Sequence, residues 1–214
     1  AVVTGNKIHQ VVEERTFSAA AISIAAADGA NATNNLIANN FIYDIKANGT
    51  NPDQTVGIGL VAGNGDKIVN NSIYMTGDTD PNASATTPDV SSFGISIQST
   101  SVSNPLISNN IIYMDLNSSS ASTLKNAGIN IPAGFSWGTG NSNYNDIYIK
   151  PSNTQSNIGC VGGSGGTFHS TLGAWQSAVS QDANSVSILP VFNSATDLHL
   201  GFVNNFALDN LGSP

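Results

Sequence analysis

Short runs of alternating apolar and small residues return along the chain at intervals of roughly 35 residues. The runs occupy positions 21–24, 57–60, 94–97 and 128–131. Because successive side chains of a β-strand point to opposite faces, this period of two predicts strands with one face in the core. Four similar strands at one spacing indicate a repeat architecture, in which each unit packs on its neighbours.

A second phrase, Asn-Asn-x-Ile-Tyr, is interleaved with the first and shares its period. It stands at positions 39–43, 70–74 and 109–113, with a degenerate copy at 144–148. Asparagine tolerates the left-handed backbone conformation and bonds to nearby main chain, so each pair predicts a corner. Short apolar strands precede the first three corners at 36–37, 68–69 and 106–107. Each period therefore holds about three short strands separated by bends.

These features predict an all-β fold, a right-handed parallel β-helix solenoid with three short strands per turn. Equivalent strands stack about 4.8 Å apart in such a solenoid, so identical side chains form columns. The right-handed sense is the default for parallel crossover connections. The predicted apolar column contains Ile58, Ile95 and Ile129, and the predicted amide ladder contains Asn40, Asn71 and Asn110.

We expect one domain in two parts, with the β-helix repeats in residues 1–160 and a C-terminal capping segment in residues 161–214. The apolar spacing of Leu172, Trp175 and Val179 predicts a short helix in this segment, which would cover the strand edges exposed at a solenoid end. Three insertions leave the repeats at one point of the period and should project from one side. They span 46–55, 77–92 and 117–126.

The composition narrows the classes of partner. Only 9% of the 214 residues are charged, and six basic against fourteen acidic residues give a net charge of −8. Such a chain lacks the clustered positive face that binds nucleic acid or an anionic membrane surface. No stretch approaches the ~20 apolar residues that span a bilayer, so we expect no membrane insertion. Cys160 is the single cysteine, and its strand-like apolar context predicts a buried, inert thiol.

The repeat phrases resemble those of right-handed parallel β-helices of the pectate-lyase-like type. The tail adds Leu-Gly-Ala-Trp-Gln, Gln-Asp-Ala-Asn-Ser, Asp-Leu-His-Leu and a final Gly-Ser-Pro, in that order. This order is similar to the end of β-helix modules in large exported surface proteins of bacteria, especially of the Bacteroidota type. The resemblance implies an extracellular or cell-surface location, and a module excised from a larger polypeptide.

Catalysis on this fold would require groups that the chain supplies sparsely. A polysaccharide lyase needs a basic proton acceptor, yet Arg15 is the only arginine and the lysines are scattered. A glycoside hydrolase needs two carboxylates that face each other, about 5–9.5 Å apart. Asp44 and Asp115 both follow repeat tyrosines but stand one residue out of register, which predicts opposite faces of the sheet.

Two groups of side chains are candidates for ligand contact. Trp137 stands in an open Phe-Ser-Trp-Gly context, and together with Tyr144 it is the candidate for stacking on a sugar ring. The longest insertion carries carboxylates for a Ca²⁺ site at Asp78, Asp80 and Asp89. Their spacing matches no calcium-binding motif, so a solvated loop is the preferred interpretation. We expect no other cofactor.

Three functions fit these observations. The preferred hypothesis is a non-catalytic β-helix module of a large exported cell-surface protein, acting as a structural scaffold or as an adhesive, glycan-presenting element. The first alternative is a carbohydrate-active enzyme on the same fold, a polysaccharide lyase or glycoside hydrolase. The second alternative is a glycan-binding module that uses Trp137 and the insertions. The expected partners are the remainder of the larger polypeptide and a polysaccharide.

Overall fold

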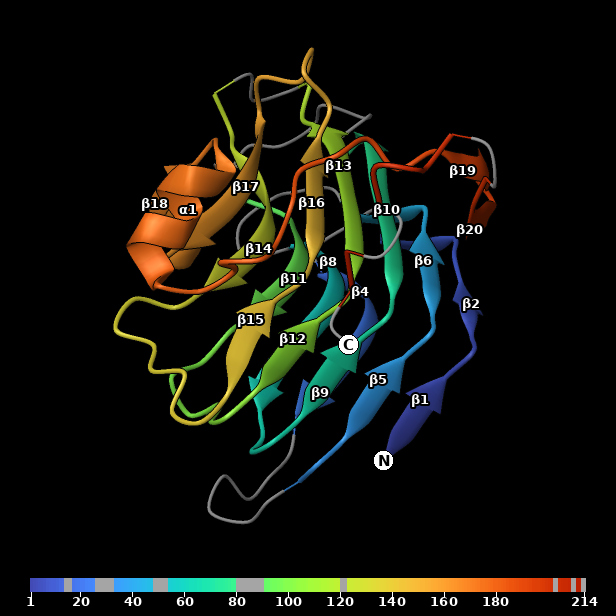
Figure 1. The fold of residues 1–214 in the computed structure, drawn as a ribbon. Helices are drawn as coiled ribbons and strands as arrows, with labels where there is room; N and C mark the ends of the chain where they lie inside the picture. Colours follow the sequence, from blue (N-terminus) through green and yellow to red (C-terminus); the bar gives the residue numbers. More distant parts are fainter. Residues whose placement is uncertain are drawn as a thin grey trace.

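Three parallel β-sheets run along the molecule, and each receives one strand from every successive coil of the chain (Figure 1). The protein is described from a computed structural model, which covers residues 1–13, 17–25, 33–47, 54–79, 91–119, 123–201, 204–208 and 211–212. Sheets 1 and 2 have five strands each, and sheet 3 has six. The stacked parallel strands form a β-solenoid, so the predicted fold class is confirmed.

The strands follow one another in the same order in each coil. Sheet 1 contains β1 (Val2–Thr4), β5 (Leu36–Ala38), β9 (Lys67–Val69), β12 (Leu106–Ser108) and β15 (Asn141–Asn143). Sheet 2 contains β2 (Lys7–Ile8), β6 (Phe41–Tyr43), β10 (Ser72–Asp78), β13 (Ile111–Asn117) and β16 (Asp146–Ile149). Sheet 3 contains β4 (Ala19–Ala25), β8 (Thr55–Ala62), β11 (Phe93–Ile97), β14 (Asn126–Ile131), β17 (Ser156–Val161) and the antiparallel β18 (Thr167–His169). Two further pairs are β3 (Val11–Glu13) with β7 (Ile45–Ala47), and β19 (Phe192–Ser194) with β20 (Asp197–Leu200).

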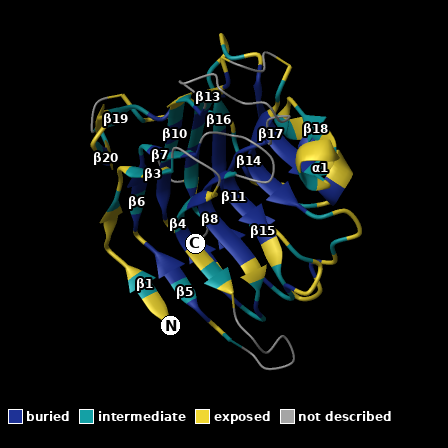
Figure 2. Ribbon diagram, turned by 180° about the vertical axis from the view of Figure 1, so that it is seen from behind, coloured by how far each residue is buried: buried dark blue, intermediate teal, exposed yellow. Residues whose placement is uncertain are grey.

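The isoleucines of both phrases form columns inside the solenoid. In sheet 3, Ile58 pairs with Ile95, which pairs with Ile129, and none of the three has exposed surface. Ile73 and Ile112 of sheet 2 stack in the same way and join the same core. Figure 2 shows β8, β11 and β14 buried over most of their length. Since burying one such side chain contributes about 1.5–3 kcal/mol, the columns are the main source of stability.

In three of the four copies of the first phrase a glycine precedes the isoleucine, because neighbouring coils approach closely there. A Cβ added to Gly94 would lie 2.7 Å from the carbonyl oxygen of Gly128 and 2.7 Å from Cγ2 of Ile112. Either distance is shorter than a normal van der Waals contact. A side chain at this position would therefore push β11 away from sheet 2 and from the next coil.

An amide ladder follows the corner between sheets 1 and 2. Nδ2 of Asn40 donates to Oδ1 of Asn71 at 2.9 Å, Asn71 donates to Asn110 at 3.0 Å, and Asn110 donates to Asn145 at 3.1 Å. Each of these acceptor oxygens also receives the backbone N–H of the asparagine one coil earlier. Asn6 begins the ladder by donating to Asn40. The ladder thus pairs polar groups that the bend would otherwise leave buried without a partner.

The residue before each ladder asparagine turns the chain. Asn39, Asn70 and Asn109 have φ angles of 55°, 56° and 57°, and Gly5 begins the series at 68°. Tyr144 takes this place in the degenerate copy, with φ of 57°. Asparagine and glycine adopt the left-handed conformation at little cost, whereas a tyrosine there is held by its surroundings.

The short helix α1 (Leu172–Val179) covers the end of sheet 3. Oγ1 of Thr171 accepts from the backbone N–H of Ala174 and caps the start of the helix. Trp175 is fully buried over Gly159, whose added Cβ would lie 2.1 Å from the indole ring. The indole Nε1 donates to Asp182 Oδ2 at 2.8 Å, which fixes the helix on the last coil.

After the helix, residues 181–188 continue over the last coil, and the later part of the segment runs along the side of the solenoid. We call its described residues 186–201, 204–208 and 211–212 the C-terminal strap, which crosses in front of sheet 2 in Figure 1. Val186 forms a parallel bridge with Asp146 of β16. Further along, Phe192 packs edge-on against Tyr74 with ring centroids 5.8 Å apart. The helix and the residues up to Ile188 thus lie on the last coil, whereas β19 and β20 contact sheet 2 from the side.

The described ends of the three insertions lie at one place in each coil. The insertions follow β7, β10 and β13, and each leads into the next strand of sheet 3. Residues 48–53, 80–90 and 120–122 lie outside the described residues, so the predicted projection from one side stays a prediction. No helix in the described part of the chain has the length and apolar character needed to cross a membrane.

Candidate functional site

The outer face of sheet 2 carries a column of aromatic rings. Because the isoleucine of each Asn-Asn-x-Ile-Tyr phrase enters the core, the tyrosine that follows it points outward. Tyr74 and Tyr113 have ring centroids 4.8 Å apart, and Tyr113 and Tyr148 are 5.3 Å apart. In the first coils, His9 stacks on Tyr43 at 4.9 Å. We call these five residues the aromatic column.

The central ring of this column keeps its hydroxyl proton over the physiological pH range. Burial, followed by the nearby Tyr74, Asp115 and Tyr148, raises the pKa of Tyr113 to about 12. Its phenol is therefore a hydrogen-bond donor and acceptor rather than a base. Tyr74, Tyr113 and Tyr148 are each half-buried, so part of each ring stays accessible beside the strap.

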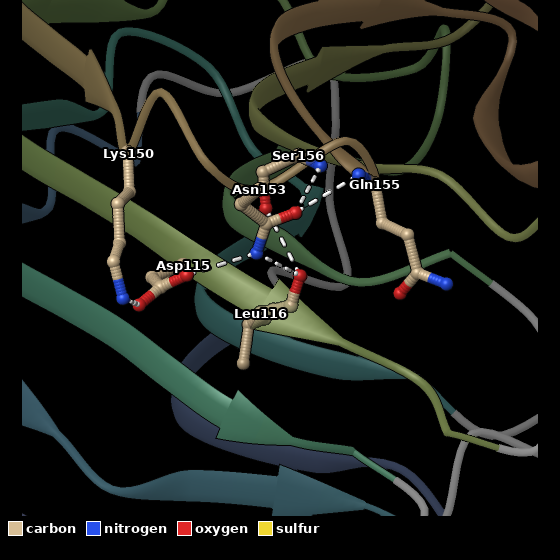
Figure 3. Close-up of polar contacts among 6 residues, drawn as sticks. All are labelled: Asp115, Leu116, Lys150, Asn153, Gln155 and Ser156. Carbon is tan, nitrogen blue, oxygen red and sulfur yellow. Dashed lines mark hydrogen bonds and ion pairs between the residues drawn. The ribbon is translucent and has the colours of Figure 1, made fainter. Parts of the chain in front are cut away.

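An ion pair joins β13 to the residue that follows β16, next to the aromatic column. Nζ of Lys150 is 2.6 Å from Oδ2 of Asp115, and Nδ2 of Asn153 donates to the other carboxylate oxygen at 3.0 Å. Figure 3 shows how Asn153 also binds the loop, since its Oδ1 accepts the backbone N–H groups of Gln155 and Ser156. The cluster thus holds the turn between β16 and β17.

The contact with Asp115 determines the proton affinity of Lys150. The hydrogen bond from Lys150 and the charge of Asp115 raise the pKa of Lys150, so the amine stays protonated at neutral pH. Lys46 pairs in the same way with Asp44 at 3.0 Å. Asp44 and Asp115, the two carboxylates weighed for a hydrolase, are each engaged by a lysine.

Asp146 is a buried carboxyl at the start of β16 in sheet 2. It is 5% exposed, and its Oδ1 accepts the backbone N–H of Ile188 in the strap at 2.8 Å. No donor among the described residues reaches Oδ2. Burial raises the pKa of Asp146 to about 7, against a smaller lowering by the bond from Ile188. The carboxyl therefore holds its proton to a much higher pH than an exposed aspartate does.

The structure does not bring the two sugar-stacking candidates together. Trp137 lies between β14 and β15, is 9% exposed and packs edge-on against Phe135. Its expected open position is wrong, because the connection folds back and the indole joins the solenoid core. Tyr144 lies at the corner between β15 and β16 and is half-buried. Ligand contact by Trp137 and by Tyr144 stays a prediction.

The acidic residues of the longest insertion are described only in part. Oδ1 of Asp78 accepts the backbone N–H of Ser119 at 3.1 Å, which links the ends of two insertions. Asp80 and Asp89 lie outside the described residues, so the predicted Ca²⁺ site stays a prediction. The described residues alone contain no group of three or more histidine, cysteine or acidic side chains suited to a metal ion.

The predicted burial of Cys160 is confirmed. Its side chain has no exposed surface, and Sγ donates to the carbonyl oxygen of Gly163. Burial raises the pKa of the thiol to about 12, so the reactive thiolate is not formed at neutral pH.

The structural roles of three residues, Asn6, His9 and Asp146, were not predicted from the sequence. Asn6 and His9 belong to a first copy of the corner phrase, Gly-Asn-Lys-Ile-His, with glycine and histidine in the places of asparagine and tyrosine. Aligning the apolar isoleucine alone would have revealed it. Asp146 gave no such signal, because its burial depends on the strap some forty residues later.

No protein family, curated protein or solved structure matches the chain. The structure by itself shows a parallel β-solenoid.

Proposed function

We propose that this chain is a non-catalytic scaffold module, a rigid β-helix within a large exported bacterial cell-surface protein. The observation that carries the proposal is the amide ladder from Asn6 to Asn145, which joins all five coils by side-chain hydrogen bonds. Such a ladder holds each coil in one register with the next and makes the solenoid stiff. The low charge and the resemblance of the tail to exported bacterial modules support the surface location.

The charges on sheet 2 also favour a non-catalytic role. A lyase needs a base that accepts a proton from the sugar, and a base works best when its pKa lies near the working pH. The pKa of Lys150 is instead raised, away from neutral pH, because Asp115 stabilises the protonated form. Asp115 in turn is neutralised by Lys150 and bonded to Asn153. The pair is suited to fixing the turn after β16.

A turnover screen tests this proposal against the enzyme alternative. The protein is incubated with neutral and acidic polysaccharides, and both new reducing ends and unsaturated uronides are measured. We expect no product above the buffer control. Turnover that disappears in Lys150→Met or Asp146→Asn, with the fold intact by circular dichroism, would contradict the proposal and establish the enzyme.

A second candidate function is glycan binding, and the partly accessible aromatic column favours it. Tyrosine combines an apolar ring with a polar hydroxyl, which suits the faces and hydroxyls of a sugar. The test is a glycan array with native protein, Tyr148→Ala and the control Trp137→Phe. Selective loss of binding in Tyr148→Ala would support this function. Equal binding by all three proteins would exclude the aromatic column as its site.

A further inference from the structure

A cavity of about 150 Å³ lies between the C-terminal strap and the corner that joins sheets 1 and 2. Its walls include Ile111, Tyr144 and Asp146 from the solenoid and Val186, Leu200 and Leu208 from the strap. In another protein, a cavity of about this size lined by aliphatic and aromatic side chains binds benzene. The present cavity has a similar volume but is open on one side and partly lined by asparagines, and it has room for a small organic ligand of about six heavy atoms.

Asp146 is the only charged group among the described residues that line this cavity, whose walls combine the aliphatic residues of the strap with four asparagines. Along β16 its side chain alternates with that of Ile147, which is fully buried in the core, so Asp146 faces outward toward the strap. One carboxylate oxygen is bonded to Ile188, and the other receives no hydrogen bond from the described residues. A buried polar atom without a partner costs about 1–3 kcal/mol, and more when it is charged. This oxygen has no exposed surface, so a ligand reaches it when the carboxylate turns toward the cavity, and a donor brought there recovers that cost.

We propose that the cavity binds a short primary alkylammonium ion, with the ammonium group at Asp146 and the alkyl chain against the leucines of the strap. An ammonium group supplies both the missing donors and the opposite charge. Among the described lining residues Asp146 is the only charged one, and Tyr144 is the only other titratable one. A cation therefore meets no competing cation there, and the apolar wall accepts the alkyl chain.

The same geometry makes binding depend on pH. Burial raises the pKa of Asp146 to about 7, so below that pH a proton occupies the carboxyl and competes with the ligand. The affinity should rise about tenfold per pH unit below pH 7 and level off above it. A primary amine stays protonated throughout, since its own pKa is near 10. A neutral alcohol of the same length carries no positive charge, so its binding should not follow this pH dependence.

The experiment titrates n-butylammonium chloride into the full chain at pH 5.5 and pH 8, at ionic strength matched with sodium chloride. Binding is followed by the backbone amide resonances of Val186 and Ile188. We expect saturable shifts at both residues and an affinity about thirtyfold higher at pH 8. The absence of saturable shifts at pH 8 would overturn the proposal, as would equal binding of n-butanol.

Two variants separate the charge from the cavity. Asp146→Asn keeps an oxygen that can accept from Ile188, so the strap stays anchored, but it removes the negative charge. We expect it to lose n-butylammonium binding and its pH dependence. Leu208→Phe should fill the cavity and weaken binding without removing the carboxylate. Asp115→Asn, which lies outside the cavity lining, is the matched control and should bind as the native chain does. If Asp146→Asn bound n-butylammonium as the native chain does, Asp146 would not be the ammonium site. If a correctly folded Leu208→Phe did so, this cavity would be excluded as the binding site.

Discussion

At the scale of single residues, two buried aspartates illustrate how partners determine the cost of burial. The carboxylate of Asp182 accepts four hydrogen bonds, from Trp175, Ser142, Asn145 and Ser185. Asp146 is buried to a similar extent but receives one, from the backbone of Ile188. Four donors replace the water that a carboxylate loses, whereas one does not. Burial therefore raises the pKa of Asp146, from 3.8 to about 7.

This difference predicts how stability depends on pH. Because the folded pKa of Asp146 is raised, its contribution is fully present below pH 4 and is lost as pH rises toward 7. The free energy of unfolding should fall over this window by up to roughly 4 kcal/mol and then level off. Denaturant titrations at pH 4, 5.5, 7 and 8 measure it. In Asp146→Asn this fall of the free energy of unfolding with pH should be absent. An unchanged fall in the variant would show that other groups cause it.

Two glycines provide a matched pair for the close contacts at the C-terminal end. Gly159→Ala would place its Cβ 2.1 Å from the ring of Trp175, so we expect the free energy of unfolding to fall by about 1–3 kcal/mol or more. Gly173→Ala, in the exposed part of α1, meets nothing within 4 Å and should stabilise the helix by about 0.5–1 kcal/mol. Thermal unfolding of both variants gives the comparison. Similar midpoints for the two would contradict the packing of Trp175 on β17.

At the scale of the elements, the solenoid combines apolar columns with polar corners. Ile58, Ile95 and Ile129 supply stability through burial, while the ladder asparagines fix where each coil bends. The two roles differ in how a substitution acts. A truncated isoleucine leaves a cavity, whereas a truncated asparagine leaves its neighbours above and below with unpaired buried groups.

Asn71 and Asn6 test the ladder with the same substitution at two depths. Asn71→Ala removes the acceptor for Asn40 and the donor to Asn110, so it should lower the free energy of unfolding by about 2–4 kcal/mol. Asn6→Ala removes the donor to Asn40 and to the carbonyl oxygen of Thr4 at an exposed end, where water replaces them, and should cost about 1 kcal/mol or less. Denaturant midpoints with unchanged slopes measure both. An equal cost at the two sites would argue against cooperative support from buried neighbours.

The strands and corners were predictable from the sequence because stacking requires similar residues at equivalent positions. Asn40, Asn71 and Asn110 therefore revealed both the corner and the ladder. Trp137 was not predictable in this way, since its burial depends on how a non-repeating connection folds back on the core. The environment of Asp146 depends on a segment that carries no repeat. Single contacts between distant segments leave no periodic pattern to read.

At the scale of the whole molecule, the chain consists of a solenoid and a strap laid along one of its sides. Strands inside the solenoid are held on both edges by neighbouring coils, whereas the strap contacts sheet 2 at separate points. These include the Asp146 bridge, the Phe192–Tyr74 contact and the edge of Phe41 against His199 at 4.7 Å. Such unequal support implies that the strap opens at a lower free energy than the solenoid does.

Leu198 is the residue with which to measure that difference, because it is 1% exposed within the otherwise open hairpin of β19 and β20. Leu198→Ala should remove about 2 kcal/mol or more of burial energy from the strap alone. Hydrogen-exchange protection of the Ile188 and Gly201 amides should then fall by at least about thirtyfold. Protection at Ile95 should stay unchanged, because the columns of sheet 3 make no use of the strap. A uniform fall at all three amides would show instead that strap and solenoid open together.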